Sequence, residues 1–119
     1  MKKKILIVDD DEVIRDLVAS FIKLCGYDSM KAPNGQKALE LVLIGKPDLI
    51  FTDIHMPLMN GFQFLRAVKR MHPDLPVVLI TGFSHFRKLF SDKTARADGF
   101  IEKPFALEVL DGYMKKFLV

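Results

Sequence analysis

Short apolar runs alternate with longer amphipathic stretches along the whole chain. We predict strands at residues 5–8, 27–31, 48–52, 76–80 and 98–102. The first run, from Ile5 to Val8, has no polar position, which is typical of a central strand that is covered on both faces. The run at 27–31 is more polar, and we therefore place it at an edge of the sheet.

Each predicted strand is followed by a stretch with helical periodicity. These stretches cover residues 12–25, 34–44, 61–71, 83–97 and 105–118. Asp11 and Asn34 are placed to cap the first two helices, and Gly26 and Gly45 are placed to end them. Polar residues leave only a thin apolar stripe at 83–97, so we expect this helix to be loosely held. Five strand–helix units in succession predict an α/β fold, in which a parallel sheet lies between two layers of helices.

Polar side chains follow four of the predicted strands, each at the point where the strand ends. They are Asp9, Asp10 and Asp11 after the first strand, Asp53 after the third, Thr81 after the fourth and Lys103 after the fifth. Because ligands of such sheets bind outside the carboxyl ends of the strands, we expect these side chains to share a pocket. Asp11 is explained as a helix cap, whereas Asp53 begins a loop and caps no predicted helix.

This set of side chains suits a divalent cation and a phosphoryl group. Carboxylates a few ångströms apart repel one another unless a cation or protons offset their charge. Oxygen ligands without clustered His or Cys favour Mg²⁺, or Mn²⁺, over zinc. A carboxylate can attack phosphorus to form an acyl phosphate, and the Lys103 ammonium and the Thr81 hydroxyl would then contact its oxygens. A cis peptide bond between Lys103 and Pro104 would aim this lysine inward.

The composition excludes several other classes of protein. The 119 residues are 50% hydrophobic, which predicts one domain with a real core and excludes disorder. No apolar stretch approaches the roughly 20 residues that span a bilayer. Cys25 is the only cysteine, which fits a reducing cytosol, and its place in an apolar helical row predicts a buried thiol. The basic residues are scattered and no aromatic residues interleave with them, so direct nucleic-acid binding is not expected.

With these motifs the chain resembles the receiver domains of two-component response regulators, chemotaxis regulators among them, over essentially its whole length. The matching stretches are residues 5–11, Asp53 to Pro57 with Asn60-Gly61, Thr81-Gly82, and Lys103 to Phe105. Each stretch is weak alone, but together, in this order and spacing, they are highly specific. The resemblance implies one receiver domain over residues 1–119, with a flavodoxin-like three-layer (βα)5 fold and a parallel sheet of strand order 2-1-3-4-5.

The resemblance also implies roles for the residues at the sheet edge. Asp53 would be the phosphoacceptor, and Asp10 and Asp53 would bind Mg²⁺ directly, together with the backbone carbonyl of His55. Asp9 would help through water or a hydrogen bond, and Lys103 would pair with the phosphoryl oxygens. The phosphodonor would be the phosphohistidine of a sensor histidine kinase or of a histidine phosphotransfer protein.

By the same resemblance, the chain would act as a cytoplasmic signalling switch, not as an enzyme. Phosphorylation would draw Thr81 inward, Phe100 would follow, and the face formed by the fourth helix, fifth strand and fifth helix would change and bind an output partner. The protein would be a monomer or a phosphorylation-dependent dimer. Gly82, Phe83 and His55 depart from the common pattern. Because neither Phe83 nor His55 offers a carboxylate or amide to orient water, we expect slow self-dephosphorylation.

Three other functions fit parts of the pattern. A phosphatase or phosphomutase with an aspartyl nucleophile usually has a cap domain and a second aspartate two residues later, where this chain has His55. A flavodoxin-like cofactor binder would have a phosphate loop rich in Ser, Thr or Gly after the first strand, where three aspartates would repel a phosphate. A degenerate receiver that only binds partners would not need the intact acidic set.

Overall fold

In the computed structural model, which describes residues 2–82 and 97–118, five parallel strands form one sheet of order β2-β1-β3-β4-β5. The strands are β1 (Lys4–Val8), β2 (Asp28–Ala32), β3 (Leu49–Asp53), β4 (Val77–Thr81) and β5 (Gly99–Glu102). The predicted order is confirmed, and the more polar β2 lies at an edge as expected. Each strand begins within one residue of its predicted start.

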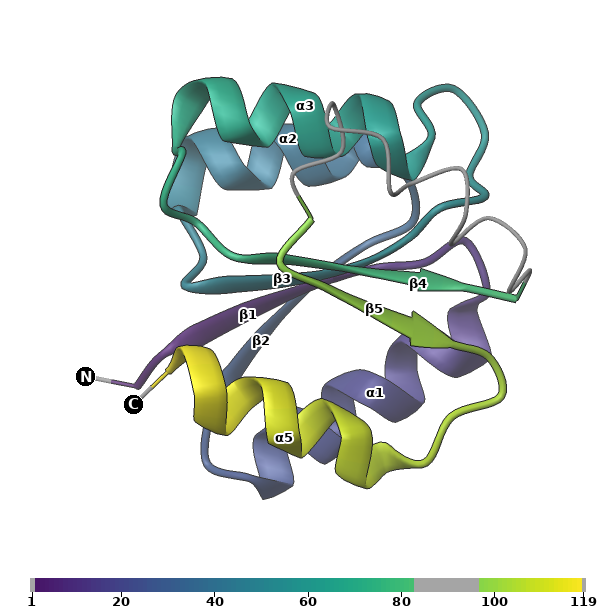
Figure 1. Cartoon of the computed structure of the whole chain (residues 1–119), viewed down its shortest axis with the longest axis vertical. Coiled ribbons are helices and arrows are strands. Elements are labelled where there is room, and N and C mark those ends of the chain that lie inside the picture. The colour runs from purple at the N-terminus through teal and green to yellow at the C-terminus, as the bar shows by residue number, and fades with distance from the viewer. Residues whose placement is uncertain (1, 83–96, 119) are drawn as a thin grey trace.

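Helices cover both faces of the sheet. Those in the described part of the chain are α1 (Glu12–Leu24), α2 (Gly35–Gly45), α3 (Gly61–Met71) and α5 (Leu107–Phe117). Figure 1 shows α2 and α3 on one face and α1 and α5 on the other, which is the predicted three-layer, flavodoxin-like sandwich. The helix predicted at 83–97 lies outside the described residues, apart from Ala97. No helix among the described residues has the length and apolar character needed to cross a bilayer.

Two hydrophobic cores, one on each face of the sheet, hold the layers together. The side chains of β1 alternate between them, so that Leu6 and Val8 pack with α2 and α3 whereas Ile5 and Ile7 pack with α1 and α5. All four side chains are buried. Burial on both faces explains why β1 is apolar at every position from Ile5 to Val8 instead of alternating with polar residues.

The register of the strands brings the candidate residues to one edge of the sheet. Asp53 pairs with Ile80 and Thr81 pairs with Glu102, so the segments that follow β1, β3, β4 and β5 leave the sheet side by side. The two ends of the chain lie at the opposite edge of the sheet (Figure 1), where Lys3 lines a hollow together with Phe117 and Leu118 at the end of α5.

Polar side chains begin the first two helices as the sequence predicts. The Asp11 carboxylate accepts hydrogen bonds from the N–H groups of Val13 at 3.0 Å and Ile14 at 3.4 Å, and Asn34 caps α2. Gly26 follows α1 with a φ of +94°, a left-handed conformation that favours glycine. α1 starts directly after Asp11. This cap therefore fixes the direction of α1 relative to the acidic segment that follows β1.

The apolar stripe of α1 is wider than the part of the helix that packs against the sheet. Part of the stripe is buried, but Val13, Leu17 and Leu24 are 77%, 55% and 85% exposed. A helix that lies on one face of a sheet turns only part of its circumference to the core, so the other apolar positions reach the surface. The prediction of a buried Cys25 is wrong, because this residue lies just past the end of α1 and is partly exposed.

Candidate metal site at the carboxyl ends of the strands

Three carboxylates meet at the carboxyl end of the sheet. Asp9 and Asp10 follow β1, Asp53 ends β3, and one carboxylate oxygen of each lies within 4.8 Å of the others. Asp9 and Asp53 are only 2% and 6% exposed, whereas Asp10 is open to solvent. The structure thus brings together aspartates from the ends of β1 and β3, which pair directly in the sheet although β2 lies between them in the sequence.

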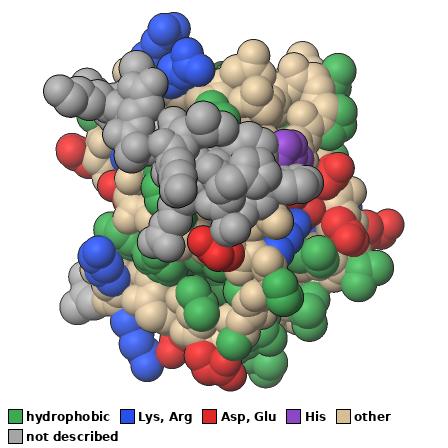
Figure 2. Space-filling view, turned by 45° about the vertical axis from the view of Figure 1, so that its right-hand side comes forward, with side chains coloured by type: hydrophobic (Ala, Val, Ile, Leu, Met, Phe, Trp, Pro, Cys, Tyr) green, Lys and Arg blue, Asp and Glu red, His purple; other side chains and the backbone are tan. Residues whose placement is uncertain are grey.

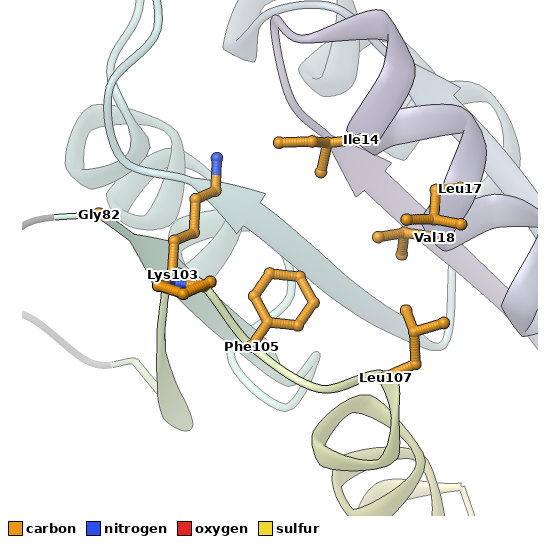
Figure 3. Close-up of a pocket in the computed structure, with 8 residues that line it drawn as sticks. Ile14, Leu17, Val18, Gly82, Lys103, Phe105 and Leu107 are labelled. Atoms are coloured by element: carbon orange, nitrogen blue, oxygen red, sulfur yellow. The ribbon is translucent and has the colours of Figure 1, made fainter.

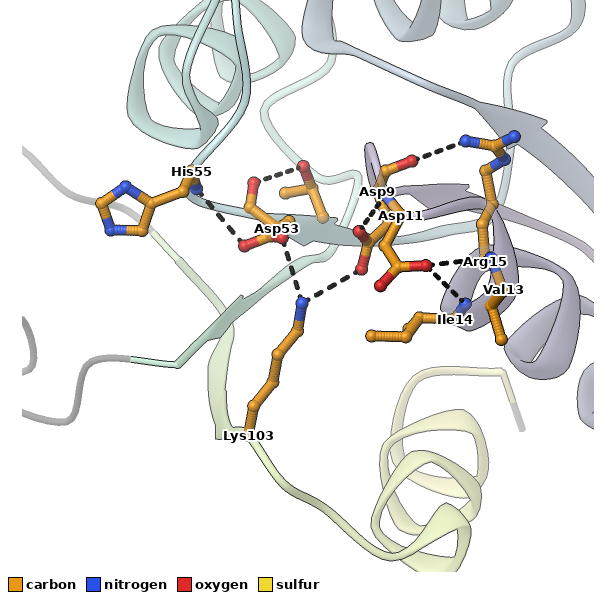
Figure 4. Close-up of polar contacts among 9 residues, drawn as sticks. Asp9, Asp11, Val13, Ile14, Arg15, Asp53, His55 and Lys103 are labelled. Carbon is orange, nitrogen blue, oxygen red and sulfur yellow. Dashed lines mark hydrogen bonds and ion pairs between the residues drawn. The ribbon is translucent and has the colours of Figure 1, made fainter.

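Lys103 reaches into this cluster from the loop after β5. Its Nζ donates to Asp53 Oδ2 at 3.1 Å and to Asp9 Oδ2 at 3.3 Å (Figure 4). The backbone N–H of Lys103 donates to the carbonyl of Thr81 at 2.7 Å, and the Lys103–Pro104 peptide bond is cis. The ammonium therefore bridges the two buried carboxylates, one from the end of β1 and one from the end of β3.

The charges within the cluster do not balance. Burial raises the pKa of the Asp9 carboxyl, although the Asp11 N–H and the Lys103 ammonium offset part of this effect. Burial would lower the pKa of Lys103, but Asp53 and Asp9 outweigh it and raise this pKa above its ordinary value. Within residues 2–82 and 97–118, Lys103 is the one side-chain cation paired with these carboxylates. Because the remaining negative charges repel one another, a bound cation would stabilise the cluster.

The donor set fits a hard divalent cation. Each of the three side chains offers a carboxylate oxygen, and no histidine or cysteine of the described residues joins the cluster. The Asp10 carboxylate makes no hydrogen bond or ion pair with another described residue, so its oxygens can turn to an ion. The N–H of His55 donates to Asp53 Oδ1 at 3.3 Å, which places the backbone of His55 beside this carboxylate. That the His55 carbonyl is a ligand stays a prediction.

Thr81 and Phe100 lie on the two neighbouring strands next to the cluster. Thr81 ends β4 and is buried, and Phe100 lies on β5, half-buried against the core beneath α2 and α3. The hydroxyl of Tyr113 on α5 donates to the carbonyl of Phe100 at 3.1 Å. This hydrogen bond joins the backbone of β5 to α5, and the movements predicted for Thr81 and Phe100 stay predictions.

Two contacts that the sequence did not reveal support the cluster through its backbone. A Cβ atom on Gly61, at the start of α3, would lie 2.6 Å from the carbonyl oxygen of Asp53, so only glycine lets α3 approach β3 this closely. Arg15 Nη1 donates to the carbonyl oxygen of Asp9 at 2.8 Å (Figure 4). The Asn60-Gly61 pair is a visible signal for a helix start, whereas no local pattern indicates the contact of Arg15.

Two hollows flank the cluster. The larger, of about 470 Å³, is mostly apolar and lies between α1 and the loop after β5 (Figure 3), where its lining includes Ile14, Leu17, Val18, Lys103, Phe105 and Leu107. The smaller, of about 360 Å³, is lined by Asp10, His55, Met56, Pro57 and Asn60. Figure 2 shows hydrophobic side chains gathered on the lower part of this face, below acidic side chains at its right. The cluster thus lies between a mostly apolar hollow, which Lys103 helps to line, and a more polar hollow, which Asp10 helps to line.

Comparisons of the sequence with known proteins identify its family. Residues 5–115 match the family described as the response regulator receiver domain. Response regulator MprA of Mycolicibacterium vanbaalenii is 32% identical over 118 residues, which are 99% of this chain and 51% of MprA. Autoinducer 1 sensor kinase/phosphatase LuxN of Vibrio campbellii is 40% identical over 106 residues, which are 89% of this chain and 12% of LuxN. The chain thus spans about half the length of one of these relatives and a small part of the other.

Solved structures show the same fold. The chemotaxis protein CheY4 of Vibrio cholerae superposes with a TM-score of 0.90 at 30% identity, covering 98% of this chain and 99% of that one. The response regulator TrrA of Thermotoga maritima, solved in complex with Mg²⁺-BeF, superposes with a TM-score of 0.87 at 34% identity, covering 97% and 98%. By sequence match and by fold, the chain belongs to the response regulator receiver domain family of two-component signalling systems.

Proposed function

We propose that this receiver domain is a Mg²⁺-dependent phosphoacceptor and that Asp53 takes up the phosphoryl group. The observation that carries the proposal is the 3.1 Å ion pair between Asp53 Oδ2 and Lys103 Nζ, inside a group of three carboxylates. The same pocket would then present an attacking oxygen and the positive charge that the phosphoryl oxygens require. The Mg²⁺-BeF complex of TrrA, a relative of 34% identity, supports the choice of Mg²⁺.

The transfer would exchange one bond to phosphorus for another. An oxygen of Asp53 attacks the phosphorus of a phosphohistidine, the P–N bond breaks, its electron pair returns to the imidazole, and an acyl phosphate remains on Asp53. Lys103 would move from the free carboxylate to a phosphoryl oxygen, and the Thr81 hydroxyl would donate to another. Asp10 and Asp53, with the His55 carbonyl, would hold the Mg²⁺, which when bound neutralises charge on the equatorial oxygens.

The phosphodonor would be a phosphohistidine on a sensor histidine kinase or on a histidine phosphotransfer protein. The match to LuxN, which is named a sensor kinase/phosphatase, supports a place in such a phosphorelay. The donor would sit over the apolar hollow beside Lys103, because this hollow is lined by the exposed Leu17 and by Lys103, which contacts the acceptor carboxylate. Burial of these apolar side chains would favour association and leave Asp53 in reach of the donor's imidazole.

Phosphorylation would act as a switch on the surface that includes β5 and α5. Thr81 would move toward the phosphoryl group, Phe100 would turn into the space it leaves, and the face formed by β5, α5 and the helix predicted at 83–97 would bind an output partner. The hydrogen bond from Tyr113 to the Phe100 carbonyl supports a coupling of β5 to α5. A stabilisation of the active state by about 1–3 kcal/mol is enough for such control. The protein would be a monomer or would dimerise when phosphorylated.

The chain is a signalling domain and not a classical enzyme, and we infer that residues 1–119 act as one cytoplasmic receiver that loses its phosphoryl group slowly. His55 and Phe83 occupy the two positions from which a carboxylate or an amide would orient the attacking water, and neither has such a group. Purified phosphoprotein should therefore keep its label for longer than seconds.

Intact mass of the protein after incubation with a small phosphodonor tests the proposal. Acetyl phosphate with Mg²⁺ should add one phosphoryl group to the parent, and either EDTA or the Asp53→Asn substitution should prevent it. Asp48→Asn is a matched control, because Asp48 directly precedes β3, at the opposite end of the strand from Asp53, and its carboxylate accepts a hydrogen bond from the N–H of Lys4. Equal phosphorylation of parent and Asp53→Asn would contradict the assignment of the acceptor.

A further inference from the structure

Arg15 ties helix α1 back to the end of β1. Its Nη1 donates to the carbonyl oxygen of Asp9 at 2.8 Å, and its own backbone N–H donates to the carbonyl of Asp11 at 2.9 Å. A hydrogen bond from a guanidinium is charge-assisted and stronger than one between neutral groups. The side chain is half-buried, so this bond is partly shielded from water. The guanidinium therefore links the first turn of α1 to the start of the acidic segment that follows β1.

The carbonyl that Arg15 holds belongs to the peptide bond between Asp9 and Asp10. A peptide unit is planar, so fixing its carbonyl oxygen also fixes the direction of the N–H and Cα of Asp10. Asp9 is held on the other side as well, since its N–H donates to the Ala32 carbonyl at 3.2 Å and its Oδ1 accepts from Asp11 N–H at 2.9 Å.

Asp10 depends on this support because its own side chain has none. Asp9 and Asp53 are bonded to Lys103, whereas the Asp10 carboxylate has no hydrogen bond or ion pair within the described ranges 2–82 and 97–118. Its approach to Asp53 is thus set by the backbone that carries it. Without Arg15, the Asp9–Asp10 peptide could rotate and take this carboxylate out of the cluster.

We propose that Arg15 is a positioning residue of the metal site, which holds the Asp9–Asp10 peptide so that the Asp10 carboxylate meets the cation shared with Asp53. The inference rests on the proposed function, because it assigns a support to the Mg²⁺ ligands. Residues that orient metal ligands typically change metal affinity by about 10–100-fold when they are removed. Because Arg15 makes no hydrogen bond to Asp53 or Lys103, we expect the reaction at saturating Mg²⁺ to keep its rate.

The positive charge of Arg15 would weaken Mg²⁺ binding, whereas its hydrogen bond to the Asp9 carbonyl would strengthen it. A cation near the cluster repels Mg²⁺, so if charge were its only contribution, removal of Arg15 would tighten metal binding. Arg66 provides a matched control, because it is an exposed arginine in the middle of α3 and its replacement changes the net charge equally. Arg15→Lys keeps the charge but replaces the guanidinium fork by a strongly hydrated ammonium.

Calorimetric titration of the full chain with Mg²⁺ tests the inference. We expect Arg15→Ala to weaken binding about 10-fold, Arg15→Lys to weaken it less, and Arg66→Ala to leave it unchanged. Urea unfolding in EDTA identifies any variant that is not folded, and Arg15→Gln, which is too short to hold the Asp9 carbonyl, replaces Arg15→Ala in that case. Phosphorylation by acetyl phosphate should recover to the parent rate at saturating Mg²⁺.

Two results would overturn the inference in different ways. If folded Arg15→Ala or Arg15→Gln binds Mg²⁺ as tightly as the parent or more tightly, Arg15 does not position the site, while the proposed function stands. If the parent itself fails to bind Mg²⁺, the proposed function fails together with the inference.

Discussion

Lys103 Nζ lies 3.1 Å from Asp53 Oδ2, although 50 positions of the sequence separate the two residues. The contact arises because β3 and β5 flank β4 and all three strands end at the same edge of the sheet. The same ammonium is 3.3 Å from Asp9, so it holds together two buried carboxylates that would otherwise repel each other. This one side chain thereby connects the stability of the site with its proposed chemistry.

Replacement of Lys103 by methionine should slow phosphorylation of Asp53 strongly. The variant keeps the acceptor carboxylate but removes the ammonium that would stabilise charge on the phosphoryl group, a kind of loss that typically lowers rates by about 100-fold or more. Initial rates with acetyl phosphate at saturating Mg²⁺ measure the effect. Lys115→Met is the control, because Lys115 forms an exposed ion pair with Asp111 on α5. Equal rates for Lys103→Met and the parent would exclude a role for Lys103 in the transfer.

The stability contributed by Lys103 should disappear in strong alkali. The folded state raises the pKa of Lys103, so its contribution is complete below the ordinary value of 10.5 and is lost as the pH rises through the higher folded-state pKa. Urea unfolding of the parent and of Lys103→Met should differ most at neutral pH, and the difference should shrink above about pH 10.5. A difference that stays constant up to the alkaline unfolding of both proteins would show that Lys103 is not held by the carboxylates.

Removal of the Asp10 carboxylate should stabilise the metal-free protein. Asp10 adds negative charge to a cluster in which Lys103 already pairs with Asp9 and Asp53. We expect Asp10→Asn to raise the free energy of unfolding in EDTA by about 1 kcal/mol, as removal of an unfavourable charge commonly does. In saturating Mg²⁺ the order should reverse, because a ligand stabilises only the protein that binds it. Thermal unfolding with and without Mg²⁺ measures both, and a variant that Mg²⁺ stabilises as much as the parent would contradict this assignment of Asp10.

Two glycines should respond to alanine in opposite ways. A Cβ on Gly61 would lie 2.6 Å from the Asp53 carbonyl oxygen and 2.7 Å from Ile54 Cα, so Gly61→Ala must push α3 away from β3 and should cost about 1–3 kcal/mol. Gly112 lies within α5 with no atom in the way, and Gly112→Ala should stabilise by about 0.5–1 kcal/mol. Urea unfolding of both variants is the measurement. A neutral Gly61→Ala would mean that α3 does not depend on this close approach.

The sequence predicts the architecture well because the relevant signals are local. The uninterrupted apolar run of β1, the Asp11 cap and the stop at Gly26 each follow from a few neighbouring residues, and the parallel sheet then brings the strand ends together. Contacts between segments that are distant in the sequence are harder to predict from it. Spacing alone does not show that Arg15 reaches the Asp9 carbonyl, and helical periodicity does not show which side of the α1 stripe, Leu17 for instance, reaches solvent.

Peptide mapping of the phosphorylated protein after borohydride reduction tests the central claim most directly. Borohydride reduces an acyl phosphate, but not a free carboxylate, to the alcohol, so the acceptor aspartate is recovered as homoserine at its position in the chain. We predict homoserine at Asp53 alone, and only when Mg²⁺ accompanied the phosphodonor. Homoserine at Asp9 or Asp10, or a label that survives as phosphoserine or phosphothreonine, would contradict the account.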